Sequence, residues 1–440
     1  MERQCGIDTL CILIRNVATK CFTELGMTQE MIDQSQIRIE TFGSYRMQTT
    51  NQNGDVDLLI IGPRSLMRNI FMEALEKEFV QTKDMNHVCY IADAYVPLLK
   101  CTLHKMEFDI VYAQLVTPIV NGIQIEEDQV LAFMDEKSIL SLNGYRVTMK
   151  LLSLLSNNNN NHLDLYRKAL LFLKYWAKQR CIYGNKYGFL GGIQLSILLL
   201  KILLLKKLTI KKDVDLINEF FRIYSTWNWD TQSVFLVSIP EHHPLAFIPP
   251  LVYDPSRPQP MVILTPCYPH MNSSFNINEQ NRTRIIKEIQ RAHLFLEKDS
   301  NMEMVSTSFG FFQEYKHFLQ FTISADTALE FHKWSGWCEA KMRLLSHHIG
   351  QHLENLQLDL LPISFPVSEN KISFFFGIHV AQTKKRKRDD EKKDKKKIIN
   401  LSIPIQKFKS LIENYKDRTS SQNYSIVHLK KSNLPSFLIL

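Results

Sequence analysis

The feature that most constrains this chain is a glycine turn followed, a short distance on, by two alternating aspartates and an apolar run. Gly43-Ser44 makes the turn, and Asp55 and Asp57 lead into Leu58–Ile61. Because side chains in a strand point to alternate faces, we expect both carboxylates on one face, at the mouth of a buried strand. Like charges this close raise each other's pKa unless a cation lies between them. Mg²⁺ prefers carboxylate oxygens together with substrate phosphates, so the pattern indicates metal-assisted phosphoryl transfer.

A third carboxylate follows on a predicted hairpin. Residues 96–103 and 106–112 read as two strands joined by a turn at His104-Lys105, and Asp109 in the second strand leaves the apolar face. If this strand pairs beside the strand of the two aspartates, three carboxylates meet at one point. That is the arrangement of a two-metal site, where one ion activates an attacking hydroxyl and both stabilise in-line displacement at phosphorus. The competing interpretation is an ordinary surface turn, which Gly-Asp-x-Asp alone would favour.

Further short blocks run along the chain in a fixed order, between about residues 40 and 345. They are Phe42–Arg46, Gly54–Asp57, Ala94–Pro97, Glu107–Asp109, Ser141–Thr148, Leu173–Lys178, Ile182–Asn185, Gly188–Gly192, Leu264–Pro269 and Phe311–His317. These blocks and their order resemble the eukaryotic poly(A) polymerases, a family of the DNA polymerase β-like nucleotidyltransferase superfamily. The first block and the stretch Lys174–Gly192 are the specific ones, because a Gly-Ser turn with paired aspartates indicates only the superfamily.

The resemblance implies an α+β multidomain fold. A polymerase β-like nucleotidyltransferase palm with an N-terminal helix is expected over residues 1–120, a helical middle domain over 121–300, and an RRM-like α/β sandwich that binds RNA over 301–440. The pattern after residue 300 agrees, because strand-like and helical stretches follow one another as in a small α+β sandwich. The aromatic signature of an RRM is not legible there, so that assignment rests on position and resemblance.

Hydrophobic periodicity predicts the individual elements. Helices are expected over residues 5–24, 163–178, 191–207, 328–353 and 408–415, and strands over 318–324, 371–380 and 398–404. The asparagine tract 157–161 is predicted to be a lengthened surface loop. The most apolar stretch, residues 189–205, is interrupted by Gln194 and Lys201, so we interpret it as a buried helix rather than a membrane span.

The resemblance also implies roles for single residues. Asp55, Asp57 and Asp109 are expected to be catalytic and to bind two Mg²⁺ or Mn²⁺ ions, with Asp109 nearest the RNA 3′-hydroxyl, either as a base or simply as a ligand. The residues expected to bind the triphosphate of ATP are Gly43, Ser44, Lys174 and Tyr183. Those expected around the adenine are Phe42, Asn185, Gly192 and Ile193, with Asn143 near the nucleotide.

Composition points to an intracellular protein. With 440 residues, of which 45% are hydrophobic, the chain is long enough for two or three domains with their own cores. Eight cysteines without a Cys-x-x-Cys pair argue against a disulfide framework or a zinc ribbon and suit a reducing compartment. The first residues lack the apolar core of a signal peptide, so secretion is not expected.

Positive charge is concentrated in one run. The net charge is +8, and residues 384–397 hold ten basic and four acidic side chains, a net +6. A run this polar cannot be buried and is predicted to be a solvated loop of the RNA-binding domain. Its KKRKR segment resembles a nuclear-import signal, which predicts a nuclear protein, and its charge would attract RNA phosphates. The alternative is a solvated loop that no receptor reads.

These observations lead to one expected function and two alternatives. We expect a template-independent polynucleotide adenylyltransferase that adds AMP from ATP to RNA 3′ ends in mRNA polyadenylation. The expected partners are ATP, the RNA 3′ end and mRNA 3′-end processing factors, with no membrane association and a monomeric state. The alternatives are a terminal uridylyl- or adenylyltransferase from outside the family, and a catalytically inactive RNA-binding scaffold.

Overall fold

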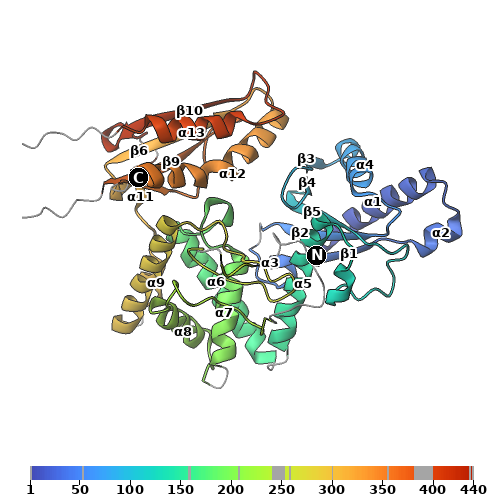
Figure 1. The fold of residues 1–440 in the computed structure, drawn as a ribbon, viewed down its shortest axis with the longest axis horizontal. Coiled ribbons are helices and arrows are strands. Elements are labelled where there is room, and N and C mark those ends of the chain that lie inside the picture. The colour runs from blue at the N-terminus through green and yellow to red at the C-terminus, as the bar shows by residue number, and fades with distance from the viewer. Residues whose placement is uncertain are drawn as a thin grey trace, which may run out of the picture.

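The protein is described by a computed structural model whose elements form three lobes (Figure 1). The described residues are 2–51, 54–156, 160–206, 209–239, 253–256, 259–299, 301–353, 356–380, 400–435 and 438. In Figure 1 the first lobe runs from blue to teal, the second from green to yellow, and the third from orange to red. A mixed sheet with helices, a helical lobe and a second sheet with helices follow one another, so the predicted α+β multidomain class is confirmed.

A five-stranded mixed sheet forms the centre of the first lobe. Its strands are β1 (Arg38–Phe42), β2 (Val56–Gly62), β3 (Met85–Ile91), β4 (Leu98–Leu103) and β5 (Met106–Gln114), in the order β1-β2-β5-β4-β3. β2 and β5 are parallel, and the other neighbouring strands are antiparallel. The β4–β5 hairpin turns at His104 and Lys105, both with positive φ, where the sequence predicts the turn.

Helices cover both faces of this sheet, which explains the unbroken apolar run in β2. The helices are α1 (Glu2–Glu24), α2 (Gln29–Gln34), α3 (Gly43–Arg46), α4 (Arg68–Gln81), η1 (Asp128–Leu131) and α5 (Glu136–Ser156). Leu58 and Ile60 share a buried cluster with α1 and α4, whereas Leu59 and Ile61 share one with α5. All four side chains are fully buried. A strand segment covered on both faces needs apolar side chains at every position, and residues 58–61 of β2 have them.

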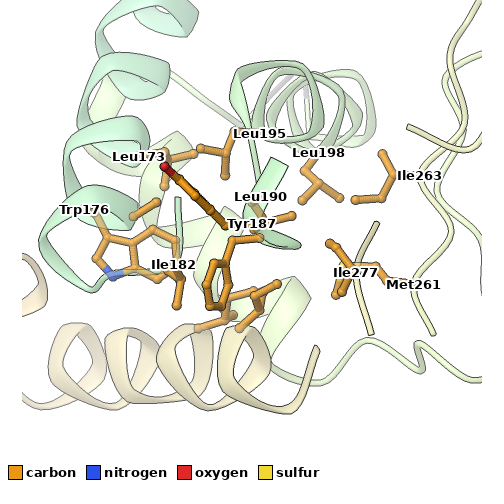
Figure 2. Packing of buried hydrophobic residues seen from close by; sticks show 14 of the residues in the cluster. Leu173, Trp176, Ile182, Tyr187, Leu190, Leu195, Leu198, Met261, Ile263 and Ile277 are labelled. Carbon is orange, nitrogen blue, oxygen red and sulfur yellow. The ribbon is translucent and has the colours of Figure 1, made fainter. Parts of the chain in front are cut away.

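The second lobe is helical, and its core holds α6 and α7 in place. Its elements are α6 (Asn160–Gln179), η2 (Asn185–Tyr187), α7 (Gly192–Leu205), α8 (Asp213–Ser225), α9 (Glu279–Asp299), α10 (Met302–Val305) and α11 (Phe311–Glu314). Figure 2 shows Leu173 of α6 next to Leu195 of α7, and Trp176 and Leu198 belong to the same buried cluster. The expectation of a buried helix within the most apolar stretch is therefore confirmed.

Two smaller expectations concern this lobe and its surroundings. Asn160 and Asn161 belong to the first turn of α6, so this part of the tract predicted as a loop is helical. Residues 157–159, like the basic run 384–397, lie outside the described residues. Across the described ranges, no helix is both long enough and apolar enough to cross a bilayer.

The third lobe is a five-stranded antiparallel sheet with two covering helices. Its elements are β6 (His317–Ser324), α12 (Ala328–His352), β7 (Leu356–Leu360), β8 (Phe365–Ser368), β9 (Lys371–Val380), α13 (Ser402–Glu413), β10 (Asn423–Lys430) and η3 (Lys431–Asn433). The strand order is β10-β6-β9-β7, with β8 added beside β9. Apart from β8, this is the β-α-β-β-α-β arrangement of ferredoxin-like and RRM-like domains. The predicted α/β sandwich is confirmed.

One element in this lobe was predicted wrongly. The sequence predicts a strand over 398–404, but residues 402–404 are the first turn of α13. Four apolar side chains recur at helical spacing and pack into the core: Leu401, Ile405, Phe408 and Ile412. The pattern therefore begins before residue 408, where the helix was predicted to start. Pro404 does not interrupt the helix, because in the first turn its missing N–H has no intrahelical partner to lose. Three further strands, β7, β8 and β10, were not predicted.

The third lobe also explains why no RRM aromatic signature is legible. Phe318 of β6 and Phe375 of β9 lie on the sheet face away from α12, and both are almost fully buried. The ring of Phe312 lies 5.7 Å from that of Phe318 and 5.3 Å from that of Phe375, and Phe365 lies 5.4 Å from Phe375. These aromatic rings are therefore covered by the chain itself.

Candidate active site

The paired strands β2 and β5 bring three carboxylates together. In the parallel register Asp57 lies directly opposite Asp109, and Asp55 stands just before β2 begins. One carboxylate oxygen from each of the three residues lies within 4.8 Å of the others. Asp55 is exposed, whereas Asp57 and Asp109 are half-buried. The cluster therefore opens to solvent on the side of Asp55.

Mutual repulsion makes this cluster unfavourable on its own. Burial, followed by the negative charges of Asp55 and Asp109, raises the pKa of Asp57 to about 7, against the opposing charges of Lys100 and Lys174. A hard divalent cation would relieve this repulsion, and three carboxylates on one open face are the oxygen ligands that such a cation prefers. The donor set therefore fits a divalent metal ion.

Lys100 is a site residue that the sequence analysis missed. It lies opposite Asp109 across the β4–β5 hairpin, and its Nζ donates to the two carboxylate oxygens at 2.6 and 2.8 Å. The signal was present in the sequence. A two-residue turn at His104-Lys105 fixes the register of the hairpin, and that register puts Lys100 beside Asp109.

Position 43 needs a glycine because Asp57 packs closely against its backbone. It has φ +63°, and a Cβ at this position would lie 2.3 Å from Oδ2 of Asp57. Its N–H donates to Oγ1 of Thr148 at 3.0 Å, and this hydroxyl donates to Gly144 O at 2.8 Å. The Gly43 N–H, expected to contact a phosphate, is thus occupied by α5. Ser44 follows as the second residue of α3.

Lys174, Tyr183 and Gly192 gather beside the carboxylates. A Cβ on Gly192 would lie 3.4 Å from Cε of Lys174 and 3.5 Å from the Tyr183 hydroxyl. Burial and the neighbouring Lys178 lower the pKa of Lys174 to about 8, while Asp55 and Asp57 act in the opposite direction. Burial and the charge of Asp55 raise the pKa of Tyr183. The second lobe therefore presents one ammonium and one phenol to the acidic cluster.

Thr49 connects this ammonium to the first lobe and was also missed. Lys174 Nζ donates to Thr49 O at 3.0 Å, which ties α6 to the loop that leaves α3. Nothing in the sequence pattern singles out Thr49, because the contact joins residues 125 positions apart.

The remaining predicted residues form two groups on different elements. Phe42 ends β1, and its ring fills the space beside Gly144, the residue that follows Asn143 on α5. Asn185 lies in η2, close to Gly191. A Cβ built on Gly191 would lie 3.4 Å from the Cβ of Asn185. Gly192 and Ile193 open α7 directly after that glycine.

Two of these side chains have an unsatisfied polar atom. Within the described residues, Oδ1 of Asn143 and Oδ1 of Asn185 are buried without a hydrogen-bond partner. Buried amide oxygens are normally hydrogen-bonded, since leaving one unpaired costs about 1–3 kcal/mol. An unpaired acceptor at both positions is therefore the kind of atom that a ligand N–H would satisfy.

The palm sheet with its carboxylate cluster defines the class, which is the nucleotidyltransferase fold. Three family models match in chain order: the poly(A) polymerase nucleotidyltransferase domain over residues 2–155, the poly(A) polymerase central domain over 165–309, and the poly(A) polymerase predicted RNA binding domain over 310–363. The chain belongs to the poly(A) polymerase family.

Individual relatives agree with this family. The chain is 30% identical over 427 residues to nuclear poly(A) polymerase 1 of Arabidopsis thaliana, covering 94% of this chain and 57% of the relative. It is 30% identical over 350 residues to poly(A) polymerase pla1 of Schizosaccharomyces pombe, covering 78% and 59%. The chain thus spans under three-fifths of the length of these curated relatives. A crystal structure of the Cid1 poly(U) polymerase with MgGTP bound is 14% identical, with a TM-score of 0.48 over 70% of this chain and 93% of that chain.

The contact between Gly43 and Asp57 predicts a selective loss of metal binding. Gly43→Ala should weaken Mn²⁺ binding about 10- to 100-fold, because its methyl group would displace a carboxylate from the cluster. Gly26→Ala is the matched control, since Gly26 also has positive φ, +73°, but a Cβ there meets nothing within 4 Å. Both variants carry backbone strain of about 1–3 kcal/mol. Equal Mn²⁺ affinities in calorimetric titrations of the two variants would contradict the prediction.

The raised pKa of Asp57 predicts how stability depends on pH. The pKa of Asp57 is about 7 in the folded chain, whereas its ordinary value is 3.8. Between pH 3.8 and 7, the metal-free folded protein therefore keeps a proton on Asp57 that the unfolded chain has lost. Its stability should therefore fall as pH rises from about 5 to 7. Asp57→Asn removes this dependence, so in chelator the variant should gain stability over the native chain as pH increases.

Denaturant titrations at pH 5, 6, 7 and 8 measure this difference. Asp33→Asn, which changes an exposed carboxylate on α2, serves as the control and should give no such trend. Saturating Mg²⁺ should reverse the order, because the native chain gains binding free energy that the variant loses. A stability difference that stays constant across this pH range would refute the assignment.

Proposed function

We propose that this protein is a polynucleotide adenylyltransferase that extends RNA 3′ ends with AMP from ATP, without a template. The carrying observation is the open cluster of Asp55, Asp57 and Asp109 facing an ammonium and a phenol from the second lobe. Membership in the poly(A) polymerase family supports this choice among the reactions that a nucleotidyltransferase fold can perform.

The residues of the second lobe would bind and orient the nucleotide. Lys174 supplies a positive charge and Tyr183 a hydroxyl donor for the triphosphate, and both lie next to the acidic cluster where the reacting phosphorus must sit. A phosphate beside Lys174 would favour its charged form. Gly192 leaves room for this approach, because a side chain there would press on both groups.

The residues of the first lobe would hold the metal and the RNA end. Asp55 and Asp57 would bind two ions, and Asp109 would bind one of them beside the RNA 3′-hydroxyl, where it acts as a base or as a ligand only. The ions, Mg²⁺ or Mn²⁺, would supply charge neutralisation at phosphorus and a more acidic hydroxyl. When pyrophosphate leaves, the Lys174 ammonium is positioned to stabilise its developing charge.

The base would lie between the two groups of predicted residues. Phe42 would offer a ring face, and the unpaired amide oxygens of Asn143 and Asn185 would accept hydrogen bonds from the base. The adenine N6 amino group is one donor that fits such an acceptor. Other bases also carry N–H donors, so the choice of ATP rests on membership in the poly(A) polymerase family. Gly192 and Ile193 would form the adjoining turn.

The wider setting of the reaction follows from the relatives and the charge distribution. Relatives named nuclear poly(A) polymerases, together with the basic run 384–397, support a nuclear location and a role in mRNA polyadenylation. The RNA substrate would contact the third lobe, and mRNA 3′-end processing factors would be its partners. We propose a monomer with domains at about 1–120, 121–300 and 301–440.

Loss of any carboxylate should remove primer extension. Asp55→Asn, Asp57→Asn and Asp109→Asn should each lower the rate at least about a hundredfold, because charge that develops in the transition state loses its counterion. The assay uses a labelled oligo(A) primer, ATP and Mg²⁺ or Mn²⁺, with circular dichroism to establish folding. Asp33→Asn is the control. Near-native extension by any one of the three cluster variants would defeat the proposed mechanism.

Nucleotide choice distinguishes the proposal from uridylyl transfer. Each of the four nucleoside triphosphates is offered separately, and ATP should be incorporated far better than UTP, CTP or GTP. Asn185→Ala should lower kcat/KM for ATP about tenfold, the usual effect of losing one buried hydrogen bond. Equal or better use of UTP would transfer the chain to the uridylyltransferase alternative. Binding of RNA without any incorporation would favour the inactive scaffold.

A further inference from the structure

The turn that contains Asn185 is contacted by residues of the second lobe and of the third lobe. η2 (Asn185–Tyr187) lies between two glycines with positive φ, Gly184 at +127° and Gly188 at +81°. Gly184 N donates to Leu190 O at 2.8 Å, so the turn closes on itself. Because so short a turn has few internal hydrogen bonds, its conformation depends on the groups that grip it from outside.

One grip comes from the second lobe, to which the turn belongs. Nδ2 of Asn281 on α9 donates to Tyr187 O at 3.1 Å and to Gly188 O at 2.8 Å. A Cβ on Gly188 would lie 2.7 Å from this amide and 2.9 Å from Asn276 O. The C-terminal end of the turn is therefore fixed within its own lobe.

The other contact comes from the third lobe, where the polar partner of the turn is a carboxylate. Glu339 on α12 forms an ion pair with Lys186 and accepts a hydrogen bond from the Tyr187 hydroxyl at 3.2 Å. The Glu339 side chain is only 16% exposed, although Lys186 is half exposed. Lys186 Nζ also lies 5.0 Å from the centre of the Tyr187 ring, which stands 6.3 Å from the ring of Phe374 in β9.

Both residues that follow Asn185 thus depend on Glu339. Burial and the charge of Glu339 raise the pKa of Tyr187, so its hydroxyl stays a donor. If α12 moved away, Lys186 and the Tyr187 hydroxyl would lose their partner together. The N-terminal half of the turn, with the unpaired Asn185 oxygen, would then be free to change conformation.

We propose that Glu339 is a positioning residue through which the third lobe sets the base-recognition turn and couples RNA binding to nucleotide binding. The inference rests on the proposed function, since it takes Asn185 as a contact to the base. α12 belongs to the lobe matched by the RNA-binding domain model, so RNA that holds this helix in place also holds the turn. By thermodynamic linkage, the nucleotide then strengthens RNA binding by the same factor.

A binding experiment separates this coupling from a purely structural contact. The dissociation constant of a non-cleavable ATP analogue with Mg²⁺ is measured by calorimetry, with and without a saturating oligo(A) of 10–15 nucleotides. Oligo(A) should tighten analogue binding to the native chain about five- to twentyfold, within the usual range of such couplings. In Glu339→Gln, the ratio of the analogue's dissociation constants without and with oligo(A) should fall close to one. In primer extension, kcat/KM for ATP should also fall, because KM rises.

The control and the rescue use residues on the same elements. Glu330→Gln makes the same change on α12, but Glu330 accepts a hydrogen bond from Thr419 within the third lobe, so the ratio should stay native. Lys186→Glu combined with Glu339→Lys restores the pair with reversed charges and should recover most of the ratio. Lys186→Gln changes a half-exposed side chain, and it carries the same test if Glu339→Gln does not fold.

The possible results have distinct consequences. A lower thermal midpoint with an unchanged ratio in Glu339→Gln and Lys186→Gln would mean that the contact is only structural, and would overturn the inference. The same holds if oligo(A) leaves analogue binding to the native chain unchanged. In both cases, normal primer extension by the native chain leaves the proposed function standing. A native chain that neither binds the analogue nor extends a primer overturns the function and the inference together.

Discussion

Parallel pairing of β2 with β5 is the interaction on which the rest of the structure depends. It alone sets Asp57 opposite Asp109, and it requires a long crossover, which α4, β3 and β4 supply. A parallel pair in the middle of a sheet must be covered on both faces, and so α1 and α4 lie on one side and α5 on the other. The acidic cluster therefore stands at the end of a rigid strand pair, where repulsion between its members cannot be relieved by movement of the backbone.

The other site residues are held in place by hydrogen bonds from two helices. Thr148 of α5 receives the Gly43 N–H, and Lys174 of α6 donates to Thr49. The site is thus formed where helices of two cores meet the loop around α3. Each hydrogen bond at this contact contributes only about 0.5–1.5 kcal/mol. The two helices can therefore separate from the loop around α3 without unfolding either core.

Much of the site could be predicted from the sequence, because its chemistry depends on local spacing. Alternation in β2 predicts the shared face of Asp55 and Asp57, and a two-residue turn fixes the position of Asp109 and Lys100. The missed contacts join distant positions: Lys174 lies 125 residues from Thr49, and Glu339 lies 153 from Lys186. In the third lobe, the apolar residues within 398–404 led to a strand prediction, whereas the helical spacing shows only when the pattern is followed from Leu401 to Ile412.

The covered aromatic face of the third lobe has a consequence for how this domain can hold a polymer. Phe318 and Phe375 are sealed beneath Phe312 and Phe365, so neither can serve as a stacking platform for bases. Beside them, Gln320 and Thr322 are bonded to Ser373 rather than left for a base edge. RNA contacts by this lobe would then fall on phosphates and sugars, which repeat identically at every nucleotide. Under the proposed function, a strand held in this way would slide by one nucleotide after each addition without meeting a preferred register.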